Sequence, residues 1–153
     1  MAPRAAEGTA TPTPETYFDI LRQLTGASPA EQLALRQQAR TTYREQPDAV
    51  NRLRLILMLA SDHRSLANLQ RARELLAELL AGAEVLPSEL TALLRWQAQQ
   101  LQGRLQLLEE LALLRQQLAE HKVALIEAEA KLEALTSIEQ TLEATTPEPV
   151  TPQ

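Results

Sequence analysis

The chain has 153 residues, with 15 Lys and Arg against 20 Asp and Glu, no Cys, 30 Leu and only four aromatic side chains. The missing Cys excludes disulfides, thiolate metal sites and cysteine nucleophiles. The acidic balance and few aromatic side chains argue against a nucleic-acid partner, and no apolar run approaches the roughly 18 residues that span a membrane. Composition therefore favours a helical protein of all-α class.

The two ends of the chain differ in composition from its middle. Six of the nine prolines lie within residues 1–14 and 144–153, and residues 1–13 and 144–153 are rich in Thr, Pro and Glu. Such segments bury too little apolar surface to offset the entropy of ordering. We therefore expect a disordered N-terminal linker over residues 1–13, a helical domain over 14–143 and a disordered Pro-rich tail over 144–153.

Capping signals predict the first two helices. Thr13 is a candidate cap for a helix over residues 14–25, and Gly26 suits a left-handed C-terminal cap. Ser28 to Glu31 form a capping box with Pro at its first helical position, which opens a second helix that ends near Gln46. The predicted inward faces contain Tyr17, Phe18, Leu21 and Leu24 in the first helix, and Leu33, Ala34, Gln37 and Tyr43 in the second.

Residues 52–59 are the one ambiguous segment, because their alternation is compatible with a strand. Leu and Met favour a helix, however, and no second strand exists for pairing. We expect a third helix that begins at Pro47 and Asp48, apolar on nearly all sides and the most buried. A fourth helix is predicted over residues 65–80. Its inward face contains Leu66, Leu69, Ala72, Leu76 and Leu79.

A single long helix is predicted over residues 87–143, since only Gly103 weakens it. The sequence leaves open whether the helix is continuous or broken near Gly103. An upstream apolar stripe contains Leu90, Leu94, Leu101, Leu105 and Leu108. The stripe changes register near Leu108 and then follows strict heptad spacing, which is typical of a coiled coil. We call the downstream set the heptad seam: Leu111, Leu114, Leu118, His121, Leu125, Ala128, Leu132, Leu135, Glu139 and Leu142.

Charge follows the same division. Residues 109–143 contain eight acidic and three basic side chains, and residues 36–104 contain ten Arg against seven acidic side chains. The sequence thus predicts a small N-terminal body of about four helices, mildly basic, followed by an acidic C-terminal helix with coiled-coil character.

Few residues point to chemistry, and we expect no enzyme, no cofactor and no metal site. The chain contains no phosphate-binding loop, nucleophile elbow or HExxH motif. His63 lies in a polar connection, where Asp62 is a candidate partner, and we interpret it as a capping or solvated residue. Trp96 is interpreted as core packing in preference to a ligand-facing role. His121 is interpreted as a polar residue that sets coiled-coil register, and a pH-sensitive seam is the alternative.

The heptad seam is the candidate partner-binding surface. Each exposed Leu forgoes roughly 1.5–3 kcal/mol of transfer free energy, so the helix must double back on its own body, dimerise or dock on another protein. We predict binding of a partner through Leu111, Leu114, Leu118, His121, Leu125, Leu132, Leu135 and Leu142.

Several segments in this order resemble the QseG-type (YfhG-like) proteins. They are LRQQAR at residues 35–40, RLRLILMLASDHRSLANLQRARELLAEL at 52–79, LPSEL at 86–90, and KLEALTSIEQTLE at 131–143, which is the most specific of them. The resemblance covers about residues 17–143. It carries no residue motif for contact with a partner.

The resemblance implies a function. QseG-type proteins are lipoproteins of the Gram-negative outer membrane that face the periplasm, bind the periplasmic sensor region of a QseE/GlrK-type histidine kinase and promote signalling to its response regulator QseF (GlrR). The expected protein is therefore a non-enzymatic activator of a two-component system. The alternative is a self-associating coiled-coil scaffold or a helical-hairpin adaptor similar to tetratricopeptide proteins.

The sequence departs from this family in having neither a signal peptide nor an acylated Cys. We expect Met1 to replace a removed signal and lipid anchor, with the residues up to Pro14 as the tether to the membrane. The expected localisation is the periplasm, at the outer membrane.

Overall fold

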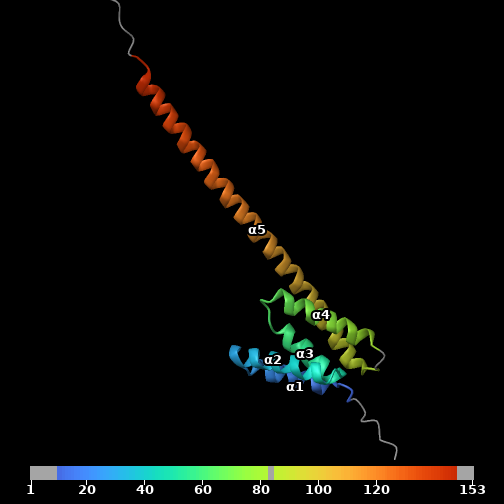
Figure 1. The fold of residues 1–153 in the computed structure, drawn as a ribbon. Helices are drawn as coiled ribbons and strands as arrows, with labels where there is room; N and C mark the ends of the chain where they lie inside the picture. The colour runs from blue at the N-terminus through green and yellow to red at the C-terminus, as the bar shows by residue number, and fades with distance from the viewer. Residues whose placement is uncertain (1–9, 83–84, 148–153) are drawn as a thin grey trace, which may run out of the picture. The chain divides into compact units, whose positions relative to one another are not determined.

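The computed structural model describes residues 10–82 and 85–147, and within these ranges the chain is all-α (Figure 1). The predicted small set of short helices followed by one long helix is confirmed. The expected disorder of 1–13 and 144–153 falls largely on residues 1–9 and 148–153, which lie outside the described residues. The helices are α1 (Pro14–Thr25), α2 (Pro29–Glu45), α3 (Ala49–Ala60), α4 (Leu66–Ala81) and α5 (Ser88–Thr145).

Side-chain caps define where the short helices begin. The Thr13 hydroxyl accepts from the backbone N–H of Thr16 at 3.3 Å, and Ser28 accepts from that of Glu31 at 3.3 Å. Asp48 and Ser65 cap α3 and α4 in the same way. Each cap satisfies a helix N–H that has no partner within the helix, so these starts are encoded within a few residues of sequence.

The central helix of the N-terminal part is α3. Eight of its 12 residues are buried, and it packs against α1, α2 and α4. This confirms the prediction that residues 52–59 form the most buried helix. A helix that is apolar on nearly all sides must be covered on nearly all sides, so α3 determines how its neighbours are arranged.

The first part of α5 completes the same core. Leu90, Leu94, Leu101 and Leu105 are buried in the cluster that contains α3. The Tyr17 hydroxyl donates to Gln97 Oε1 at 3.2 Å, and both side chains are buried. Burial raises the pKa of Tyr17, which keeps its hydroxyl protonated as the donor of this bond.

Several residues that were predicted to face inward are exposed instead. Phe18 and Leu33 are 46% and 50% exposed, while Ile20 and Ala39 are buried in their helices. Leu66 is exposed as well. These residues all lie in amphipathic helices. In such a helix the sequence is compatible with burial of either of two neighbouring faces, and packing against α3 selects the one that is buried.

Gly26 also differs from its prediction. It has φ −84° and ψ −8°, a right-handed conformation. Its N–H donates to the carbonyl of Arg22, as in one more turn of helix. The prediction of a left-handed cap is therefore wrong, because the chain continues from α1 to Ser28 without a residue in the left-handed conformation.

The chain divides into two units, residues 1–109 and residues 110–153. The first contains α1 to α4 and the buried part of α5, and the second contains the remainder of α5. Gly103 lies inside α5 in the first unit, and α5 is helical through it.

We predict that Gly103→Ala stabilises the protein. A Cβ at this position meets no atom within 4 Å, and Ala in a helix interior is favoured over Gly by about 1 kcal/mol. Thermal unfolding followed by circular dichroism should show a melting temperature a few degrees higher. An unchanged or lower melting temperature would contradict a regular, solvent-exposed helix at residue 103.

The Ser28 cap should make stability depend on pH. The Ser28 backbone N–H donates to Glu31 Oε2 at 2.6 Å, and this bond, with the Ser28 hydroxyl, holds the pKa of Glu31 below its ordinary value of 4.5. Because ionised Glu31 favours the folded state, its contribution is complete above pH 4.5 and is lost as the pH falls through the lowered folded pKa.

Comparison of Glu31→Gln with the wild type tests this dependence. The two proteins should differ in unfolding free energy at neutral pH and converge under acid conditions, measured by urea denaturation at each pH. A difference that stays constant across this range would show that the charge of Glu31 contributes nothing.

Candidate partner-binding surface

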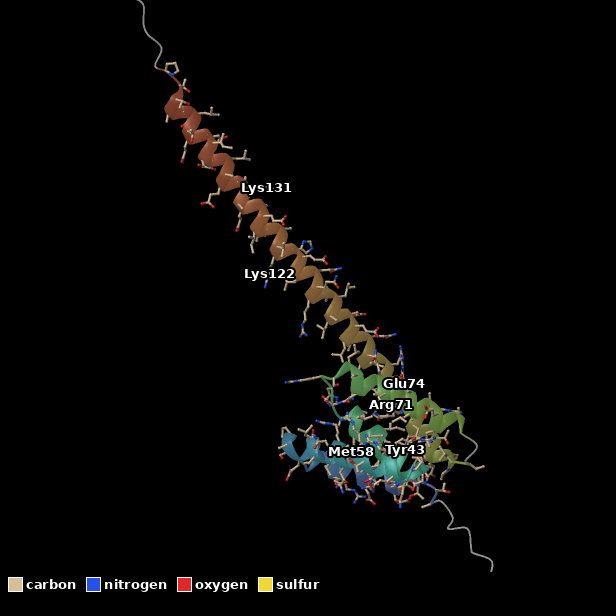
Figure 2. All side chains as sticks on the ribbon, in the orientation of Figure 1. Tyr43, Met58, Arg71, Glu74, Lys122 and Lys131 are labelled. Atoms are coloured by element: carbon tan, nitrogen blue, oxygen red, sulfur yellow. The ribbon has the colours of Figure 1, made fainter. Side chains whose placement is uncertain are left out.

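The second unit contains a helix whose surface is uncovered. Every residue from Glu109 to Pro147 is exposed. The helix forms here because α5 is rich in strong helix formers such as Leu, Ala, Glu and Gln. A helix satisfies its backbone hydrogen bonds internally, so this segment needs no tertiary packing for its backbone. Figure 2 shows side chains projecting from all sides of it, Lys122 and Lys131 among them.

The eight predicted partner-binding residues all lie on this exposed helix. The seven Leu among them are between 46% and 64% exposed, Leu111 the least and Leu132 the most, and His121 is exposed with them. Solvent therefore reaches every member of the predicted surface. Large apolar side chains exposed in such a row are typical of an interaction surface.

Heptad spacing places these residues on one stripe of the helix. Since 3.6 residues make one turn and the repeat averages 3.5, the stripe winds by roughly 20° per heptad around a straight helix. A partner helix can follow the stripe only by supercoiling around α5. This geometry is that of left-handed coiled coils, in which each side chain fits into a hole between four side chains of the partner.

The structure adds exposed apolar residues that the heptad pattern did not single out. Leu107 lies four residues before Leu111 and is 61% exposed, so the heptad seam extends one position upstream. Spacing from Leu111 was the available signal, but the buried stripe that ends near Leu108 obscured it. Four further residues are exposed outside the seam: Leu113, Val123, Ile126 and Ile138.

Charges on this helix are mostly unpaired within it. The Gln116 amide donates to Glu120 Oε1 at 3.0 Å, and the ion pairs among the described residues lie in the first unit, Arg22 with Asp19 and Arg71 with Glu74. With eight acidic against three basic side chains in residues 109–143, this helix taken as a whole attracts cationic groups.

The structure places the two residues considered for chemistry. His63 is exposed, in keeping with its interpretation as a capping or solvated residue. Its ring Nδ1 lies 3.1 Å from Arg104 Nη1, and Asp62, the alternative partner, accepts from Asn68 instead. Trp96 is 55% exposed. Its interpretation as core packing is therefore wrong, because α5 turns its buried stripe away from this residue.

Two other kinds of site are absent from the described residues. No group of three or more His, Cys, Asp or Glu side chains in residues 10–82 and 85–147 is placed to hold a metal ion. Across the same residues, no helix combines the length and apolarity needed for crossing a bilayer.

Comparison with known proteins identifies no relative of this chain. No protein-family model, no curated protein and no solved structure matches it.

Proposed function

We propose that this chain is a non-enzymatic periplasmic accessory protein that binds the sensor region of a two-component histidine kinase and promotes its signalling. The exposed heptad seam carries the proposal, because seven Leu on one helix stripe lie open to solvent. The proposed kinase is of the QseE/GlrK type, on the resemblance of residues 17–143 to QseG-type lipoproteins. In this proposal a lipid anchor upstream of the sequence holds the protein at the outer membrane.

Docking of helix on helix is the proposed mechanism. The sensor regions of such kinases would offer a helical surface, and the heptad seam of α5 would pack on it as a coiled coil. A bound accessory protein shifts a kinase toward signalling only if it binds the signalling conformation more tightly. The proposed activator therefore recognises a helix arrangement that the active kinase adopts.

Two members of the heptad seam, Glu139 and Ala128, disfavour parallel pairing with a second copy and so favour a different polypeptide. In a parallel pair in register, each seam residue faces its own copy, so Glu139 would face Glu139 and Ala128 would face Ala128. The first pairing places like charges in the seam, and the second leaves unfilled space. A partner with a cationic side chain opposite Glu139 would remove the first cost.

We predict that Leu118, Leu125 and Leu132 changed together to Asp abolish kinase binding without unfolding the first unit. These side chains are 55–64% exposed, so the changes remove partner contacts and leave the core of residues 10–109 unaltered. Loss of three buried Leu should weaken affinity at least about 100-fold. The measurement is calorimetric binding to the purified sensor domain, with helix content checked by circular dichroism.

A matched control lies on the same helix outside the heptad seam. Leu113, Val123 and Ile126 are similarly exposed, and their change to Asp adds the same charge. This control should bind the sensor domain within a few-fold of the wild type. Equal effects of the two triple variants, or full binding by the seam variant, would contradict the docking proposal.

We predict that the wild-type chain is monomeric at micromolar concentration and that Glu139→Leu promotes its self-association. The substitution replaces the like charge in the seam with an apolar side chain, which should tighten the dimer at least about tenfold. Glu133→Leu removes the same charge outside the seam and should have no such effect. Sedimentation equilibrium measures both.

The same experiment addresses the second candidate function. A wild-type dimer whose population does not change with dilution in this range would favour the self-associating scaffold over a kinase-binding protein. In that case Leu118, Leu125 and Leu132 changed to Asp would yield a monomer.

A further inference from the structure

A cavity of about 470 Å³ lies within the first unit, at the carboxyl end of α3. Its walls come from α1, α2, α3, the segment after α3 and the first part of α5. This volume is in the range of sites that hold a small organic molecule, which combine apolar walls with a few polar groups. The cavity shares no residue with the heptad seam.

Apolar side chains form the base of the cavity. Tyr17, Leu24, Leu57 and Ala60 line it and belong to the buried core. Because the core holds these side chains, the base of the cavity is formed before any ligand arrives. A preformed apolar surface binds a ligand with little loss of side-chain entropy.

Trp96 lines the same cavity and is 55% exposed. An indole has a large apolar area, and its exposure here leaves a flat face available for stacking. Covering this face with the apolar part of a ligand is favourable in proportion to the area removed from water.

A guanidinium group provides charge at the cavity wall. Arg104 Nη1 donates to the Ala60 carbonyl at 3.3 Å and lies 3.1 Å from His63 Nδ1. Its Nε and Nη2 make no hydrogen bond to the described residues, and no described carboxylate forms an ion pair with it. These two nitrogens form the fork that binds a carboxylate or sulfonate through two parallel hydrogen bonds.

The surroundings of Arg104 strengthen the preference for an anion. Arg36 Nη1 donates to the Ser61 hydroxyl at 3.4 Å, and Ser61 lines the cavity together with Arg104. Both Arg belong to residues 36–104, which contain ten Arg and seven acidic side chains. The wall itself contains one guanidinium, that of Arg104, and no carboxylate, so the cavity favours anions over neutral or cationic ligands.

We propose that this cavity binds a small organic anion with an apolar, preferably aromatic, body. The body lies against Tyr17, Leu24 and the indole of Trp96, and the anionic group accepts hydrogen bonds from Nε and Nη2 of Arg104. This binding activity belongs to the first unit and does not depend on the proposed kinase function.

Two fluorescent probes of matched shape test the proposal. Anilinonaphthalene sulfonate has an aromatic body with an anionic group, and phenylnaphthylamine has the same rings without it. Trp96 is the only Trp, so energy transfer from Trp96 reports probe bound near the cavity. All titrations use the full chain with Leu118, Leu125 and Leu132 changed to Asp, since an exposed leucine stripe also binds such probes.

The sulfonate should bind at least about tenfold more tightly than the neutral probe. Arg104→Gln should remove this preference, and Arg104→Lys should restore part of it through charge without the fork. Arg95→Gln, an exposed change on the same helix, should leave both affinities unchanged.

Equal affinity of the two probes for the Arg104 protein would overturn the proposal, as would equal effects of Arg104→Gln and Arg95→Gln. The first comparison needs no substitution at Arg104, so it decides the matter even if Arg104→Gln unfolds. Thermal unfolding of each variant shows whether its fold is retained.

Discussion

Covering α3 is the constraint around which residues 10–109 are arranged. Its buried residues occur on all sides, so α1, α2, α4 and the start of α5 must surround it. Each of these neighbours needs only one apolar stripe, which explains how short amphipathic helices form a stable unit. At the carboxyl end of α3 the cover includes Arg104, which donates to the Ala60 carbonyl. The cavity that Trp96 lines lies at this end of α3.

The long helix α5 contains two apolar stripes with different environments. Its upstream stripe is buried through Leu105, and its residues from Glu109 onward are exposed. A helical backbone continues regardless of this change, since its hydrogen bonds are internal. Apolar side chains do depend on this change, because burial away from water is what makes them stabilise the fold. The upstream stripe serves folding, and the heptad seam is left available for association in the function proposed.

Local chemistry made much of the fold predictable. The caps at Thr13 and Ser28 depend on atoms only a few residues apart, and the structure has them as expected. The sequence left open whether the long helix continues past Gly103, and α5 is helical through this residue. The eight candidate partner-binding residues could be chosen by heptad spacing alone. Phe18 and Trp96 could not be placed correctly, because either neighbouring face of an amphipathic helix can be buried and distant helices select between them. The cavity was unpredictable for the same reason, since its walls come from residues as far apart in the sequence as Tyr17 and Arg104.

The sequence by itself determined the helices, their starts and the repeat of the heptad seam, because these follow from interactions within about one turn of helix. Only the tertiary structure decided which apolar stripes are covered. Burial depends on what other segments of the chain bring to each face, and no local pattern contains that information. For the same reason only the fold brought Tyr17, Trp96 and Arg104 to one cavity.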